Sequence, residues 1–156
     1  MGWESRLGKE DTLPERQTAK ILDEMGLKYE RNRYVETPFR DYPIEADRIV
    51  DDCLVIEVQS ERFHMKTRRQ RKDVAKRNCF KAMGFGVLWL WDKELEWAFQ
   101  VKRGEVWRPA IKGWVTVALE YARELRAQHM RLLNLQVPHI THPDYGLIGL
   151  EEDRYP

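Results

Sequence analysis

Long apolar runs are missing from this sequence of 156 residues. A membrane-spanning helix needs at least about 18 consecutive apolar residues, whereas the apolar run at residues 85–91 ends after seven. The first 15 residues also lack the apolar region of a signal peptide. These absences exclude a membrane partner and predict an intracellular, cytoplasmic protein.

Cysteine is scarce, and the formal net charge is only +1. Neither Cys53 nor Cys79 has a second cysteine at metal-ligand spacing, so free thiols in a reducing compartment are expected.

The charges are unevenly distributed, because residues 61–81 carry nine Lys and Arg against two acidic residues. This segment therefore has a net charge of +7 within a nearly neutral chain.

Apolar periodicity predicts an α/β chain that forms one domain over residues 1–156, with a core at about 12–95. Residues 96–156 would form a C-terminal helical extension and a tail. The first helix is expected to begin after Thr12, because Thr12 and Glu15 have the spacing of a capping box. Gly26 is expected to end it.

Further elements follow from alternating or continuous apolar residues and from turn residues. A turn at Asp51-Asp52 is expected to join the second and third strands. The predicted elements are strands at 27–35, 44–50, 53–58 and 85–91, a basic helix at 65–83, a strand pair at 98–106 turned at Arg103-Gly104, and a long helix at 114–135.

Polar side chains interrupt two neighbouring predicted strands. Asp47 lies in one of them, and Glu57 and Gln59 share one face of the next because they are two residues apart. The hairpin would bring the two acids within reach of one hard cation, and Mg²⁺ prefers oxygen ligands. Alternatively, Glu57 and Gln59 are the solvent face of an edge strand. The apolar neighbours favour the cation, since a carboxylate in a buried strand needs a partner.

Three more residues could complete a site, and each also has an ordinary structural explanation. His64 follows the third strand, where a neutral imidazole could accept a proton from water, or it is a surface residue. Asp73 could orient that imidazole, or it forms a salt bridge with a basic neighbour on its helix. Glu15 could support the site, although the capping box alone explains it.

The basic segment predicts contact with a polyanion, because crowded cations repel one another unless anions lie nearby. A solvated helix face is the alternative. Contacts with DNA phosphates are expected from Arg62, Lys66, Arg68, Arg69, Arg71, Lys72 and Lys76.

The order of these residues resembles the PD-(D/E)XK nuclease superfamily. The residues that carry the resemblance are Glu15, Asp47, Glu57-Val58-Gln59, His64 and Asp73. Over residues 12–92, the sequence is most similar to the very-short-patch-repair (Vsr)-like branch, which includes the EDxHD homing endonucleases. The resemblance implies a restriction-endonuclease-like αβββαβ core, with a mixed sheet between helices and an added C-terminal helix, in a protein of bacterial or phage type.

The resemblance also implies a DNA endonuclease that depends on Mg²⁺, with Mn²⁺ as a substitute. Asp47 would be the main metal ligand, helped by Glu57 and by a backbone carbonyl at Val58 or Gln59. His64 would activate water. Asp73 would orient the water or join the metal shell, and Glu15 would support the site from the first helix.

Two departures from the family pattern matter. The lysine expected after the second acid is Gln59, so His64 would take over its role, and the usual Asp-Gly is Gln59-Ser60. The missing lysine keeps a second interpretation open, in which an inactive nuclease fold binds nucleic acid through its basic helix. A homodimer is expected if the product is a double-strand break.

Overall fold

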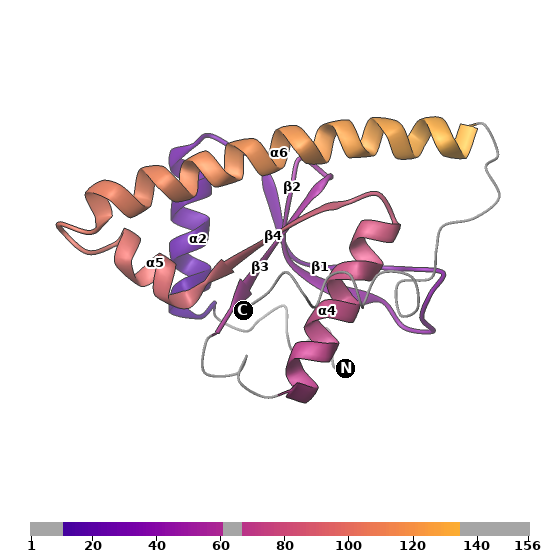
Figure 1. Ribbon diagram of the computed structural model, residues 1–156, viewed down its shortest axis with the longest axis horizontal. Coiled ribbons are helices and arrows are strands. Elements are labelled where there is room, and N and C mark those ends of the chain that lie inside the picture. Colours follow the sequence, from indigo (N-terminus) through magenta and orange to yellow (C-terminus); the bar gives the residue numbers. More distant parts are fainter. Residues whose placement is uncertain (1–10, 61–66, 135–156) are drawn as a thin grey trace.

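The computed structural model describes residues 11–60 and 67–134 (Figure 1). The elements are α2 (Leu13–Glu24), β1 (Tyr29–Val35), β2 (Ile44–Val50), β3 (Leu54–Gln59), α4 (Thr67–Ala82), β4 (Gly86–Trp91), α5 (Asp92–Ala98) and α6 (Gly104–Asn134). A mixed sheet flanked by helices confirms the predicted α/β class, and the order from α2 to β4 confirms the predicted αβββαβ core. Within these ranges, no helix has the length and apolarity that crossing a membrane requires.

The sheet has the strand order β1-β2-β3-β4. β2 pairs antiparallel with both β1 and β3, whereas β3 and β4 are parallel. β3 is therefore an internal strand, as its apolar sequence LVIEVQ favours, and both Glu57 and Gln59 are buried on it. The alternative that these two residues form the wet face of an edge strand is wrong.

Short local signals determine the ends of α2 and the turn between β2 and β3. The Thr12 side chain accepts a hydrogen bond from the Glu15 N–H, and the Glu15 carboxylate accepts one from the Thr12 N–H, which confirms the predicted capping box. Gly26 follows the helix with φ 69°. Asp51 and Asp52 have φ of 51° and 54°, a left-handed conformation that aspartate tolerates in tight turns.

Helices cover both faces of the sheet. α4 packs on one face, where Cys79 and Phe80 contact the cluster that includes Ile49 and Val55. The other face is covered by α2, α5 and α6, and Figure 1 shows α6 running along the whole width of the molecule on that side. The core there contains Ile21, Leu22, Leu54, Ile56, Leu90, Leu95, Ile111, Val115, Leu119 and Ala122.

The predicted strand pair at 98–106 is wrong, because this segment forms the end of α5, a turn and the start of α6. The Glu94 carboxylate accepts the Trp91 N–H at 3.0 Å and thereby satisfies a donor at the beginning of α5. The turn is tight at Gly104, where a Cβ atom would lie 2.6 Å from the Ala98 carbonyl oxygen. Because of this close approach, the turn requires glycine at position 104, which is also the first residue of α6.

The long helix is confirmed, but it begins ten residues before the predicted start at Trp114. Pro109 and Gly113 suggest a helix break in the sequence, and the structure accommodates both. Pro109 lies in the second turn of α6, so its missing N–H costs a single hydrogen bond near the helix end.

Two arginines of α6 form ion pairs with the two aspartates of the β2–β3 turn. The Arg123 Nε lies 2.8 Å from Asp51 Oδ2, and Arg126 donates to both the carboxylate and the backbone carbonyl of Asp52. Arg33 of β1 also binds Asp52, at 2.6 Å. The hydrogen bond from Arg33 is the main cause that lowers the pKa of Asp52 below its ordinary value of 3.8.

Candidate active site

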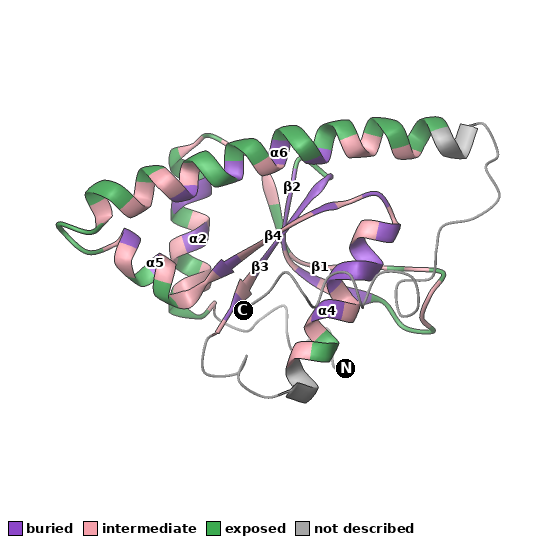
Figure 2. Cartoon of the chain, viewed as in Figure 1, coloured by how far each residue is buried: buried purple, intermediate pink, exposed green. Residues whose placement is uncertain are grey.

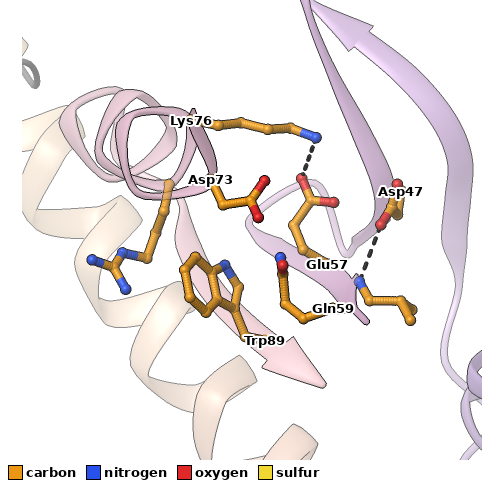
Figure 3. A pocket seen from close by; sticks show the side chains of 8 residues that line it. Asp47, Glu57, Gln59, Asp73, Lys76 and Trp89 are labelled. Carbon is orange, nitrogen blue, oxygen red and sulfur yellow. Dashed lines mark hydrogen bonds and ion pairs between the residues drawn. The ribbon is translucent and has the colours of Figure 1, made fainter. Parts of the chain in front are cut away.

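A pocket lies between the sheet and α4 (Figure 3). The sequence predicts that Asp47, Glu57, Gln59 and Asp73 share one site, and the structure brings all four to this pocket. Its lining residues are Asp47 from β2, Glu57, Val58 and Gln59 from β3, Trp89 from β4, and Asp73, Lys76 and Arg77 from α4.

Backbone geometry explains why these side chains converge. Arg48 pairs with Ile56 across β2 and β3, so the next residues, Asp47 and Glu57, lie together on the opposite face, which is the face toward α4. Glu57 is in turn level with Trp89 on the parallel neighbour β4. On α4, residues 73, 76 and 77 are three and four positions apart and therefore share one side of the helix.

Asp47 and Glu57 form a carboxyl pair in which Glu57 is buried and Asp47 is half-buried. The Val58 N–H donates a hydrogen bond to Asp47 Oδ2 at 3.0 Å and so orients that carboxylate. The Glu57 residue is only 4% exposed. Burial raises the pKa of Glu57 well above its ordinary value of 4.5, and the neighbouring charge of Asp47 raises it further. A positive charge next to Glu57 would therefore favour its ionised form.

Lys76 supplies a positive charge to the pair. Its Nζ lies 2.9 Å from Glu57 Oε1, and Figure 3 shows the side chain reaching from α4 toward the carboxylate. Burial opposes the charge on Lys76, but the attraction of Glu57 and Asp47 outweighs it and raises the pKa of the ammonium group. Lys76 thus places an ammonium group in the site, whereas the sequence analysis assigned it to DNA contact. Its spacing of three residues after Asp73 is the signal that could have shown this.

Arg77 and Trp89 form another part of the lining that the sequence analysis did not include. The Arg77 guanidinium carbon lies 4.7 Å from the centre of the Trp89 ring, within the range of a cation–π contact. Arg77 is 2% exposed, so this contact is held in the interior. Two basic residues of α4 consequently point inward, and only part of the basic segment faces solvent.

The oxygen donors fit a hard divalent cation. Asp47 and Glu57 line the pocket and offer carboxylate oxygens, the ligand type that Mg²⁺ prefers. Across residues 11–60 and 67–134, no group of three or more His, Cys, Asp or Glu side chains is close enough to hold a metal ion. A metal here would therefore depend on two carboxylates, with water or substrate oxygens as further ligands.

Comparisons with known proteins give one structural similarity. No protein-family model matches the sequence, and the curated proteins give no match. Among solved structures, the chain is similar to one titled "Homing Endonuclease I-Bth0305I Catalytic Domain". The two share 29% sequence identity over 68% of this chain and 97% of that chain, with a TM-score of 0.48.

The other predicted site residues are not among the described residues that line this pocket. The Glu15 carboxylate accepts a hydrogen bond from the Thr12 hydroxyl at 2.8 Å in the capping box, and Glu15 is not part of the pocket lining. Arg71 and Lys72 are exposed on α4, as predicted for contact with a polyanion. Arg68 and Arg69 belong to the first turn of α4, whereas Arg62, His64 and Lys66 lie outside the residues that the structure describes.

Proposed function

We propose that this chain is a Mg²⁺-dependent DNA endonuclease of the PD-(D/E)XK type, from the Vsr-like branch, and that the pocket between α4 and the sheet is its active site. The observation that supports this most is the pair of the half-buried Asp47 and the buried Glu57, with the Lys76 ammonium beside it. The pair opens into a pocket, and the helix above it presents cations to solvent.

The acid pair costs more folding free energy than is expected of a feature with a purely structural role. An apolar pair of side chains would stabilise an internal strand better than two adjacent carboxyl groups, which lose hydration and repel each other. Strongly perturbed carboxyl groups in a cleft are typical of sites that bind a cation or transfer protons. Bound Mg²⁺ would supply Lewis-acid activation of the phosphate and of water.

The side chains of the pocket have separable roles in the proposed reaction. Asp47, oriented by the Val58 N–H, and Glu57 would hold the ion, and a carbonyl at Val58 or Gln59 stays a predicted ligand. The Lys76 ammonium would stabilise negative charge on the phosphate, the task that the superfamily gives to a lysine where this chain has Gln59. His64 is proposed as the base that takes the proton from water.

DNA would approach over α4. Arg71 and Lys72 are exposed there, one helical turn before Lys76, so phosphates bound to them would lie next to the pocket. Such contacts are independent of base sequence and weaken with added salt. Asp73 lines the pocket on the same helix and would orient water there.

A plasmid cleavage assay tests the proposal directly. Supercoiled DNA is incubated with the wild-type protein in Mg²⁺, Mn²⁺ or EDTA, and nicked and linear products are measured. Asp47→Asn and His64→Ala should abolish the metal-dependent cutting, and Lys76→Met should slow it by roughly 100-fold or more. Asp41→Asn, a change at an exposed carboxylate outside the pocket, is the matched control and should cut like the wild type.

DNA binding is measured in parallel to separate chemistry from affinity. The Asp47→Asn variant should still bind DNA, whereas Arg71→Ala combined with Lys72→Ala should weaken binding and reduce its salt dependence. If no metal ion supports cutting but binding persists and weakens with salt, the chain is an inactive nuclease fold that binds nucleic acid. Cutting by Asp47→Asn at the wild-type rate would show that the pocket is not the active site.

A further inference from the structure

The outer side of α6 carries a row of exposed apolar side chains, of which Trp114 packs in part against another ring of the same helix, that of Trp107. Val106 is 71% exposed, Val117 66%, Tyr121 64% and Trp114 39%. Their spacing along the helix puts them within one face, opposite the residues that pack on the sheet. Figure 2 shows exposed residues along this outer side of α6. A row of this kind is typical of a surface that another protein covers.

Gly113 lies on the same face and has no role in packing among the described residues. It is exposed, and a Cβ atom at this position would meet nothing within 4 Å. Glycine in an exposed helix interior costs about 1 kcal/mol relative to alanine, so this position loses stability without a contact that needs it. A glycine here would let a second helix approach closely, since it has no side chain.

The two ends of the apolar face carry opposite charges. Lys102 and Arg103 are exposed just before the first turn of α6, whereas Glu120 and Glu124 are exposed at the other end of the face. Arg131 contacts Glu124 at 3.6 Å, and both side chains are more than 60% exposed, so this ion pair is weak and leaves Glu124 accessible. A partner that presents the same face in the opposite direction would match both charges.

We propose that this face is a homodimer interface, in which α6 packs antiparallel against α6 of a second copy. A two-fold axis between Gly113 and Trp114 would place Val106 against the partner's Tyr121 and Ala110 against the partner's Val117. The same axis would place Arg103 against the partner's Glu124, which satisfies the charges at both ends. A two-fold dimer requires a surface patch that is complementary to the same patch on a second copy.

The interface would leave the pocket accessible. α6 packs on the face of the sheet opposite to α4, and the pocket is lined from the α4 side. Two copies joined through α6 would therefore keep two open pockets. The proposal does not depend on the proposed function, and its test uses no cleavage measurement.

Sedimentation velocity over a range of concentrations is the first test. The wild-type chain should sediment as a dimer that dissociates on dilution, and Val117→Glu should sediment as a monomer at concentrations where the wild type is a dimer. Val101→Glu is the matched control, because Val101 is 89% exposed in the turn before α6 and lies outside the face. This variant should still form the dimer, and circular dichroism confirms that both variants are folded.

Cross-linking tests the position of the axis. Gly113→Cys should form a disulfide between two copies under mild oxidation, because the two-fold axis passes beside it. Thr116→Cys is exposed on another side of α6 and should not cross-link. The native Cys53 and Cys79 are buried and do not interfere.

A charge exchange tests the polarity of the pairing. Arg103→Glu alone should weaken the dimer, and combining it with Glu124→Arg should restore it. A wild-type chain that is monomeric at every concentration, for example because residues 135–156 cover the face themselves, would overturn the proposal. A dimer that survives Val117→Glu and does not cross-link through Gly113→Cys would overturn it as well.

Discussion

Gly86 is the first residue of β4, and α6 leaves no room for a side chain at this position. A Cβ atom on Gly86 would lie 2.6 Å from the Ala122 Cβ and 3.1 Å from the Ala122 Cα. Carbon atoms in contact are normally about 3.5–4.0 Å apart, so α6 would have to move by roughly 1 Å. Overpacking of this kind costs about 1–3 kcal/mol, and the smaller unfolded-state entropy of alanine returns about 0.4–1 kcal/mol. Gly86→Ala should therefore lower the free energy of unfolding by up to about 2.6 kcal/mol, and by about 1.3 kcal/mol at the middle of these ranges.

A double-mutant cycle shows whether the clash is the cause. Ala122→Gly alone costs about 1 kcal/mol in helix propensity, but it removes the atom that lies closest to the added methyl group. The double variant should therefore be more stable than the sum of the single effects by about 1 kcal/mol or more. Urea unfolding followed by tryptophan fluorescence measures all four proteins.

The cycle has a matched control on the same helix. Ala118→Gly carries a similar propensity cost, but position 118 does not belong to the contacts of Gly86. Its effect should add to that of Gly86→Ala without coupling. If Ala122→Gly and Gly86→Ala were also simply additive, the packing of α6 on the start of β4 would be refuted.

Three further variants test the charges and caps. Glu57→Gln should gain stability relative to the wild type as the pH rises above 4.5. The reason is that the raised pKa of Glu57 makes its ionisation unfavourable in the folded state. Unfolding curves of both proteins at several pH values measure the difference. Asp52→Asn should cost about 1 kcal/mol or less at neutral pH. The difference should shrink as the pH falls below 3.8 and vanish only below the pKa of the folded state, which is lower. Thr12→Ala should lower the unfolding free energy by about 0.5–2 kcal/mol in the same assay.

Local signals predicted most of the fold up to residue 91. The capping box at Thr12 determines where α2 begins, and Asp51-Asp52 can adopt the left-handed turn without a partner. These features depend on neighbouring residues in the chain, which is why the sequence is sufficient to predict them.

The errors concern contacts between distant residues. Pro109 suggests a break when read locally, but α6 tolerates it because packing at Ile111 and Val115 stabilises the helix beyond it. Similarly, Lys76 resembles the other cations of its helix until the fold brings Glu57 to 2.9 Å from its ammonium group. Sequence periodicity contains no information about which strand a helix will cover.

The order in which the elements are synthesised has a consequence for folding in the cell. Leu54, Ile56 and Leu90 share one core cluster with Ile111, Val115, Leu119 and Ala122 of α6, which follows them in the chain, so this cluster is complete only when α6 has packed on the sheet. At a translation rate of about 5–20 residues per second, the 31 residues of α6 take roughly 2–6 s to make. During that interval the nascent sheet exposes an apolar face, a condition that favours binding of a chaperone at the ribosome. Folding of this chain is therefore expected to finish only after α6 has left the exit tunnel.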